Sequence, residues 1–387
     1  MENSRRAILK GSLAAVGLGV FGVPGWALPV LAQGESVIPF TDVPATFNAT
    51  LRAGANPSRN LDLRKLERFT PKDQFFTTQH LGHPTVDLAT YKLKISGLVD
   101  KPHAYTIDEL KTLGATDLVA GFECSGNSPR GIEGLVSNAR WTGVPLQKVL
   151  KAANLQPDAH EIVFLGSDHS TSDVEWRTQK FSLDQQFGRS LMREEALGPE
   201  PFLAWAMNGE PLTVPQGFPL RLITPGWYGV ANVKWLAQIH AQEDRYVGNY
   251  EARWYRTVKG VEIDGEEKFL ETAISRMRVK SVIARVTKDG AQATVMGFAL
   301  TDGTPIKTIE VKVDDGPWQA ATLDASNTKY SWKLFTYNWK NPSAGEHTLV
   351  SRATDAKGRV QPTAQDLAEK KSFLEDNSQF PRKVMVA

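Results

Sequence analysis

The spacing of apolar residues predicts short strands and short helices over about 73–256. Residues 91–95, Tyr-Lys-Leu-Lys-Ile, alternate as a strand of a half-buried sheet does. Thr106, followed three residues later by Glu109, is typical of a helix start in which the two side chains cap the first turn. Residues 146–155 predict a short helix. This mixture indicates a domain that contains both sheet and helices.

The pattern changes in the C-terminal third of the chain, where a period of two dominates. Ile309, Val311 and Val313 alternate with charged residues, and the Asp-Asp-Gly run at 314–316 then predicts a turn. The same alternation recurs at 330–334, Tyr-Ser-Trp-Lys-Leu. Strands at short intervals with turns between them predict an all-β sandwich.

We therefore predict an α+β protein in four parts. Residues 1–32 are expected to be an export signal and 33–72 a polar, loop-like N-terminal extension. A mixed α/β domain follows at 73–260, and a β-sandwich at 275–387. No internal repeat divides the chain further.

The amino terminus predicts export. Arg5 and Arg6 stand before a moderately apolar, glycine-rich stretch at 11–32, a pattern typical of a bacterial twin-arginine signal. Cleavage after Ala32 would start the mature chain near Gln33 and would make the protein periplasmic. A membrane anchor is the alternative, and the prolines and glycines of the stretch disfavour it because they weaken a spanning helix.

Composition and charge exclude several classes of protein. Hydrophobic residues make up 41% of the 387 and charged residues 23%, as in ordinary globular proteins. The formal net charge is +2, and the predicted signal carries that excess, so the remainder is about neutral. A neutral body without a basic stripe argues against nucleic acid as a partner. The single cysteine excludes an internal disulfide.

That cysteine, Cys124, lies in the run Gly-Phe-Glu-Cys-Ser-Gly-Asn-Ser at 121–128. Small and polar neighbours suit a thiolate presented into a cavity, and thiolate is a soft ligand for a polarisable metal. The alternatives are a buried core cysteine and a free thiol. The sequence contains none of the common nucleotide, zinc-protease, hydrolase or haem-attachment motifs, and its histidines lack zinc-ligand spacing.

A second informative run extends from Gly217 to Trp235. Arg221 and Lys234 stand there among prolines, glycines and strongly apolar residues. Charges in such a context are costly to bury without partners, and a bound phosphate would pair them. Two ordinary salt bridges are the alternative.

Taken together, these segments resemble the sulfite oxidase family, and bacterial sulfite and sulfane dehydrogenases in particular. The resemblance covers most of 73–350. It implies a mixed α/β domain that binds molybdenum–molybdopterin, followed by an immunoglobulin-like dimerisation domain. The segments that carry it are Phe75-Phe76, residues 123–127 (Glu-Cys-Ser-Gly-Asn), 139–146 (Ala-Arg-Trp-Thr-Gly-Val-Pro-Leu), 207–212 (Met-Asn-Gly-Glu-Pro-Leu) and 217–235.

The resemblance also implies roles for individual residues. Cys124 matches the protein's ligand to molybdenum. Tyr255 matches the family's active-site tyrosine, and Arg130 lies near the position of a family arginine at the substrate. The positions that match or adjoin those holding the cofactor are Phe76, Thr77, Thr78, Gln79, His80, Asp168, Gln216, Arg221, Asn232, Val233 and Lys234.

Three departures from the family fall at the site, two beside the substrate and one, Gln216, at a cofactor contact. Thr78 replaces an arginine that usually precedes the histidine matched by His80. The loop from 127 to 137 lacks the tryptophan usually found there, and Gln216 stands where some members have a histidine. The cofactor site is therefore expected to be retained, while recognition of a small dianion such as sulfite is altered.

We therefore expect a periplasmic molybdenum oxidoreductase that transfers an oxygen atom to a small sulfur compound such as sulfite. A separate cytochrome c would accept the electrons, because the chain carries no haem motif. A homodimer is possible by the same resemblance. The alternatives are a reductase of sulfoxides or other oxo-donors, a catalytically decayed cofactor- or partner-binding protein, and an enzyme with a cysteine nucleophile.

Overall fold

A computed structural model describes residues 31, 34–44, 46–128, 133–368 and 370–387. The predicted export signal, apart from Leu31, and Arg130 lie outside these residues. Over the described residues no helix is long and apolar enough to cross a membrane. The helical elements are short: α2 (Ile107–Thr112), α3 (Leu146–Ala152), α4 (Arg193–Ala196), η2 (Leu63–Lys65), η4 (Val214–Gln216), η5 (Gly229–Ala231), the π-helical turn η6 (Asn249–Arg253) and η7 (Gln365–Leu367).

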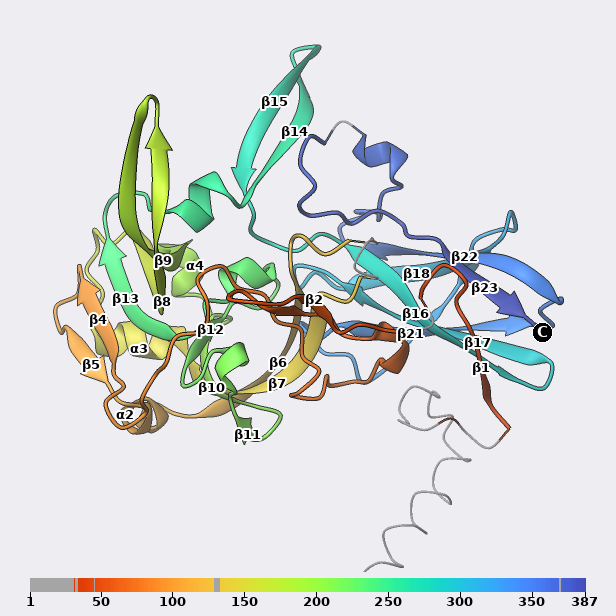
Figure 1. The fold of residues 1–387 in the computed structure, drawn as a ribbon, viewed down its shortest axis with the longest axis horizontal. Helices are drawn as coiled ribbons and strands as arrows, with labels where there is room; N and C mark the ends of the chain where they lie inside the picture. The colour runs from red at the N-terminus through yellow and green to blue at the C-terminus, as the bar shows by residue number, and fades with distance from the viewer. Residues whose placement is uncertain (1–30, 32–33, 45, 129–132, 369) are drawn as a thin grey trace, which may run out of the picture.

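Two five-stranded sheets form the first half of the described chain (Figure 1). In one of them β4 and β13 are parallel, whereas its other neighbours are antiparallel. Its order is β5 (His103–Tyr105), β4 (Leu93–Gly97), β13 (Leu236–Gln242), β8 (Glu161–Trp176), β9 (Gln179–Met192). The other sheet runs β11 (Glu210–Pro211), β10 (Phe202–Met207), β7 (Val136–Pro145), β6 (Thr116–Glu123), with β12 (Arg221–Ile223) also paired to β10.

The C-terminal half is a two-sheet β-sandwich. Apolar residues of both sheets, among them Val295 and Phe335 from one and Val311 and Leu349 from the other, form a single core between them. The first sheet is β1 (Ser36–Ile38), β16 (Lys280–Asp289), β17 (Gln292–Leu300), β21 (Lys333–Lys340), β20 (Thr322–Leu323), and the second is β19 (Gln319–Ala320), β18 (Ile306–Val313), β22 (Gly345–Asp355), β23 (Arg382–Val386).

Two hairpins project from the body in the same view (Figure 1). One is the outer part of β8 and β9, and the other is formed by β14 (Arg256–Ile263) and β15 (Glu266–Ala273). The second hairpin lies in sequence where the two predicted domains, 73–260 and 275–387, meet.

A shared core joins the two halves. Trp141 of β7 belongs to the same buried cluster as Val282 and Phe298 of the sandwich. Burial of apolar area at roughly 25 cal/mol per Å² makes such a continuous cluster a major stabilising contact. The sandwich therefore packs firmly against the sheet that carries Cys124.

The N-terminal extension is more ordered than its sequence predicts. β1 pairs with β16 of the sandwich, although the two strands are far apart in sequence. β2 (Thr50–Arg52) and β3 (Ser58–Arg59) form a short hairpin of their own. The loop-like prediction was wrong here because pairing with distant segments supplies the hydrogen bonds that the local sequence does not specify.

Local predictions fared better. The Thr106–Glu109 capping box is present at the start of α2. The strand predicted at 91–95 is β4, shifted to Leu93–Gly97, and the helix predicted at 146–155 is α3, which ends at Ala152. β18 contains the alternating run that ends at Val313. The fold is mostly β with short helices, so the α+β prediction holds in this coarser form.

The strand predicted at 330–334 begins later than expected, because β21 starts at Lys333. Trp332 precedes β21, and its indole donates a hydrogen bond to the carbonyl of Arg68 at 3.1 Å. A buried tryptophan N–H requires an acceptor, which here comes from the N-terminal extension rather than from a strand partner.

Candidate active site

One pocket collects most of the residues singled out in the sequence. Its walls come from the segment after η2, the end of β6, the start of the β8–β9 hairpin and the segment between η4 and β13. The predicted residues that line it are Phe76, Thr77, Thr78, Gln79, His80, Cys124, Asp168, Arg221, Asn232, Lys234 and Tyr255. Among the described residues these side chains thus meet at one place.

Cys124 lies directly after β6, where the strand gives way to a tight loop. Its backbone N–H donates to the carbonyl of Leu135 at 2.9 Å, and its own carbonyl accepts from the N–H of Asn127 at 2.9 Å. Cys124 is half-buried as a residue and lines the pocket. Burial, together with the charge of Glu123, raises the pKa of the thiol to about 11, although a hydrogen bond from Gly126 opposes this. A bound metal cation would hold it as thiolate.

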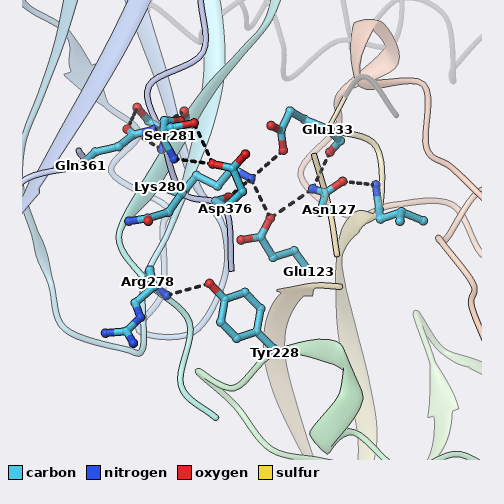
Figure 2. Close-up of polar contacts among 12 residues, drawn as sticks. Glu123, Asn127, Glu133, Tyr228, Arg278, Lys280, Ser281, Gln361 and Asp376 are labelled. Carbon is cyan, nitrogen blue, oxygen red and sulfur yellow. Dashed lines mark hydrogen bonds and ion pairs between the residues drawn. The ribbon is translucent and has the colours of Figure 1, made fainter. Parts of the chain in front are cut away.

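The rear of this loop is fixed by a buried lysine from the sandwich (Figure 2). The Lys280 ammonium lies 3.3 Å from a carboxylate oxygen of Glu123 and 2.6 Å from one of Glu133. All three side chains are at most 2% exposed. The ammonium also donates to the carbonyl of Asp376 at 2.9 Å. Burial lowers the pKa of Lys280, but the two carboxylates outweigh this effect and raise it overall.

Asn127 completes the rear network by tying the two ends of the loop together (Figure 2). Its amide N–H groups donate to the carboxylate of Glu123 at 3.1 Å and to the carbonyl of Glu133 at 2.9 Å. Its carbonyl oxygen accepts from the N–H of Leu135 at 3.0 Å. Every polar group of the Asn127 side chain is therefore used in holding the loop.

Arg221 has a different environment on the pocket side. Its guanidinium donates to the carbonyls of Gln216 at 2.8 Å and Asn232 at 3.2 Å, and it lies over the ring of Trp141 at 5.0 Å. Its Nε has no partner, and no carboxylate of the described chain pairs with it. Burial lowers the pKa of Arg221 to about 9. A buried guanidinium without a counter-ion is costly unless an anion binds it.

Lys234 and Asp168 are likewise poorly paired. The Lys234 ammonium donates to the Gln79 side-chain oxygen at 3.2 Å and the Pro215 carbonyl at 3.1 Å. Burial and the charge of Arg221 lower the pKa of Lys234 to about 7, with Asp168 acting in the opposite direction. Burial raises the pKa of Asp168 to about 6, and one of its carboxylate oxygens has no hydrogen-bond partner. The alternative of two ordinary salt bridges for Arg221 and Lys234 was therefore wrong.

At the Cys124 end of the pocket, Tyr255 meets His80. The tyrosine hydroxyl and the His80 Nε2 are 2.7 Å apart. Burial, then the charges of Arg52 and Lys234, lower the pKa of His80 to about 4, so the imidazole is neutral at pH 7. Burial raises the pKa of the Tyr255 hydroxyl above its usual value, so it keeps its proton. The His80 ring also stacks on that of Tyr250, with centroids 4.9 Å apart.

A second buried ion pair supports this corner from behind. The Arg189 guanidinium lies 3.0 Å from Glu251 and donates to the carbonyls of Tyr250 and Ile274, each at 2.6 Å. The N–H of Ile274 in turn donates to the Tyr255 carbonyl at 2.9 Å. The backbone on both sides of Tyr255 is thus fixed by groups outside the pocket.

Two predicted site residues of the described chain, Gln216 and Val233, do not line the pocket. The Gln216 side chain accepts from Thr213 N–H at 3.2 Å and donates to the Lys72 carbonyl, so it faces away. Val233 is fully buried in the core behind the wall. Arg130 lies outside the described residues. Only the backbone of Gln216 reaches the site, through its hydrogen bond from Arg221.

Sequence reasoning missed most of the apolar part of the wall. The Phe75-Phe76 pair was noted for its resemblance only, and nothing in the run that forms β9 singled out Phe187. The unpredicted lining residues are Phe75, Phe122, Phe187, Pro215, Gly229, Val230 and Trp235.

The residues fit a molybdenum–molybdopterin cofactor. Arg221 and Lys234 offer unpaired positive charge to a phosphate, and the orphaned Asp168 oxygen offers an acceptor to the N–H groups of a pterin. No three His, Cys, Asp or Glu side chains of the described chain converge to hold a metal ion by themselves. Cys124 would therefore supply a single thiolate, and the cofactor the remaining ligands.

Comparison with known proteins agrees with this fit. Residues 80–250 match the family described as oxidoreductase molybdopterin binding domain. The chain is 28% identical over 328 residues to mitochondrial sulfite oxidase of Drosophila melanogaster and 28% identical over 324 residues to that of Homo sapiens, covering 76% of this chain in each case. It spans 55% and 57% of those two proteins.

The sulfite oxidase of Arabidopsis thaliana is 27% identical over 330 residues, which cover 76% of this chain and 82% of the plant protein. The fold is similar to that in the crystal structure of the sulfane dehydrogenase SoxCD from Paracoccus pantotrophus, with a TM-score of 0.72 and 22% identity over 96% of this chain and 95% of the other. The chain is therefore similar to the sulfite oxidases in sequence, and its residues 80–250 match a molybdopterin-binding oxidoreductase domain.

Proposed function

We propose that the protein oxidises a small sulfur compound, with sulfite as the leading candidate. In that reaction sulfite and water give sulfate, two protons and two electrons, so no dioxygen is consumed. One observation carries the proposal: a single pocket joins the Cys124 thiol to three poorly paired charges, the buried Arg221 and Asp168 and the half-buried Lys234.

The chain's own residues would divide the task of holding the cofactor. Cys124 would bind the metal as thiolate, while Arg221 and Lys234 would bind the phosphate. Asp168 would accept hydrogen bonds from the pterin. When bound, the cofactor supplies oxygen-atom transfer and the subsequent one-electron steps.

Tyr255 and His80 would manage the proton at the substrate. Since His80 is neutral and Tyr255 keeps its proton, the hydroxyl can donate a hydrogen bond to a substrate oxygen. The hydroxyl and the imidazole lie within hydrogen-bonding distance, so a proton released by water could pass from one to the other. The rings of Phe187 and Tyr250 stack on the imidazole and hold it beside the tyrosine hydroxyl.

The first experiment measures metal and turnover on the purified protein. Mass spectrometry should find molybdenum close to stoichiometric with protein, and extraction should yield the pterin. Sulfite, thiosulfate and a sulfoxide are then compared, with cytochrome c as acceptor for oxidation and a reduced dye as donor for reduction. Faster sulfoxide reduction would favour the reductase alternative, and absence of turnover in molybdenum-loaded protein would favour a decayed enzyme.

The location and the partners belong to the same proposal. Twin arginines at positions 5 and 6 support export to the periplasm, where a cytochrome c would collect the electrons. Arg5→Lys combined with Arg6→Lys should leave the protein in the cytoplasm. The C-terminal sandwich supports an immunoglobulin-like domain and a homodimer through it, which mass photometry of the holoenzyme would test.

A further inference from the structure

A single buried arginine holds the chain on both sides of Tyr255. The Arg189 side chain, in β9, is 1% exposed and is not among those that line the pocket. One of its terminal nitrogens donates to the carbonyl of Tyr250 in the π-helical turn η6, and the other donates to the carbonyl of Ile274, directly after β15. Because the N–H of Ile274 donates to the Tyr255 carbonyl, the arginine fixes both flanking segments relative to β9.

The same arginine also acts on His80, the partner of Tyr255. The Tyr250 ring stacks on the His80 imidazole, with centroids 4.9 Å apart. Phe187, two residues before Arg189 in β9, stacks on Tyr250 with centroids 4.7 Å apart. Tyr250 thus connects β9 to His80, since its carbonyl is bound by Arg189 and its ring contacts the imidazole. The 2.7 Å approach of the Tyr255 hydroxyl to His80 Nε2 therefore depends on Arg189 from two directions.

The charge of Arg189 is paired with a carboxylate of the same turn. Its Nε lies 3.0 Å from Glu251, whose side chain is 9% exposed. This carboxylate also accepts from the N–H of Ser190 at 3.1 Å, so β9 binds Glu251 through two successive residues. A buried ion pair adds little net stability, because desolvation of the charges offsets their attraction. The pair does give a fixed place to the π-helical turn, a rare backbone form that often occurs at functional sites.

We propose that Arg189 and Glu251 form a positioning pair that sets the Tyr255 hydroxyl against His80 for proton transfer at the substrate. Neither charged side chain lines the pocket, so the pair acts only through the segments that it binds. A hydroxyl displaced by about 1 Å loses much of its effect on the transition state, whereas the rest of the pocket still binds the substrate. This inference rests on the proposed function, since it assumes that Tyr255 takes part in the reaction.

The test removes both charges at once, in Arg189→Met combined with Glu251→Gln, so that neither is left buried without its partner. In the holoenzyme the kcat for sulfite should fall by about 10- to 100-fold, with little change in KM. Arg189→Lys should lie between this double variant and the wild type, because an ammonium keeps the ion pair but cannot reach both carbonyls. The matched control is Arg352→Met with Glu310→Gln, which removes an ion pair of the sandwich and should leave kcat unchanged.

Repeating the substitutions in Tyr255→Phe separates positioning from general damage to the fold. If the pair acts through the Tyr255 hydroxyl, the double substitution should change kcat by less than about twofold once that hydroxyl is gone. An equal loss in both backgrounds, or an unchanged kcat in the wild-type background, would refute the inference. A wild-type rate in Tyr255→Phe itself, or loss of molybdenum and pterin from the double variant, would refute it as well.

Nitrogen NMR of holoenzyme labelled at its histidines separates this inference from the proposed function. The hydrogen bond from Tyr255 shifts the Nε2 resonance of His80, and Tyr255→Phe assigns that signal by removing the shift. If the wild type does not oxidise sulfite but the double substitution at Arg189 and Glu251 alters this resonance, the positioning stands and the assigned reaction is wrong. If the wild type oxidises sulfite while the double variant keeps both its kcat and this resonance, the reaction stands and the positioning role is refuted.

Discussion

The two sides of the Cys124 loop bury charge in opposite ways. Behind the loop, Lys280 is enclosed by two carboxylates and a carbonyl, and Asn127 uses all its polar groups. In front of it, Arg221 and Lys234 meet only neutral oxygens. The charge of Lys280 behind the loop is therefore neutralised by the chain, whereas the buried Arg221 and the half-buried Lys234 in front of it have no counter-ion in the described chain.

The difference separates structure from binding. A buried charge with its partners in the chain stabilises the fold of that chain, whereas a buried charge without partners costs stability until a ligand arrives. The rear network is complete without a cofactor, so it fixes the loop in advance. Arg221 and Lys234, in front of the loop, would gain a counter-ion only from a bound anion. We therefore regard them as part of the cofactor site.

The largest effect should come from the residue shared by both sides. Cys124→Ser should abolish sulfite oxidation, because a serine hydroxyl is a poor replacement for a thiolate as a soft ligand. The absorption bands that arise from sulfur-to-metal charge transfer should change at the same time. Unaltered turnover in a variant with normal molybdenum content would contradict the ligand assignment.

Breaking the rear network should damage the fold. Lys280→Met leaves Glu123 and Glu133 buried without their cation, and removal of one partner of a buried pair costs about 3–5 kcal/mol. The free energy of unfolding, measured by denaturant titration on cofactor-free protein, should fall by that amount. The double variant Lys280→Met with Glu133→Gln removes one of the stranded charges and should recover part of the loss. Equal stability of single variant and wild type would show that the network does not hold the loop.

Removing a charge in front of the Cys124 loop should leave the stability almost unchanged and weaken cofactor binding. Lys234→Met should change the stability of cofactor-free protein by no more than about 1 kcal/mol, because its contacts are two neutral hydrogen bonds and its charge is costly to bury. The affinity for the cofactor should fall by about 10- to 100-fold through the lost phosphate contact. Pterin content after dilution of the purified protein measures this. A large loss of stability with full pterin content would place Lys234 among the structural charges.

The last prediction concerns pH. The folded protein keeps the proton of Asp168 up to a pKa of about 6, whereas the unfolded chain loses it near 3.8. Between these values the folded state binds more protons, so stability falls as pH rises. Cofactor-free wild type should therefore lose stability relative to Asp168→Asn between about pH 4 and pH 6. A constant difference over this window would mean that Asp168 is paired.

Sequence patterns predicted those parts of the molecule that depend on near neighbours. The capping box at Thr106 needs only residues of its own turn, and the strand that ends at Val313 follows from alternation. Cys124, Arg221 and Lys234 stood out because a reactive or charged residue in an apolar, glycine-rich run is unusual, and the pocket does contain them.

Contacts between distant segments could not be read in this way. Lys280 and Glu133 are 147 residues apart, and Tyr255 and His80 are 175 apart. Nothing in the local pattern around Lys280 distinguishes it from a surface lysine at the start of a strand. The docking of the β2–β3 hairpin against Thr77 was missed for the same reason, because it depends on a contact between separate segments.

The route of the N-terminal segment has a consequence for biosynthesis. β1 pairs with β16, and Phe40 forms a bridge with Val384 of β23, before the chain continues to the hairpin beside the pocket. The ribosome releases β1 and Phe40 long before β16 and β23, so these contacts can form only after the C-terminal strands have emerged. Since contacts of such long sequence separation form slowly, we expect the pocket to mature after translation has passed β23, when the chain first becomes able to receive its cofactor.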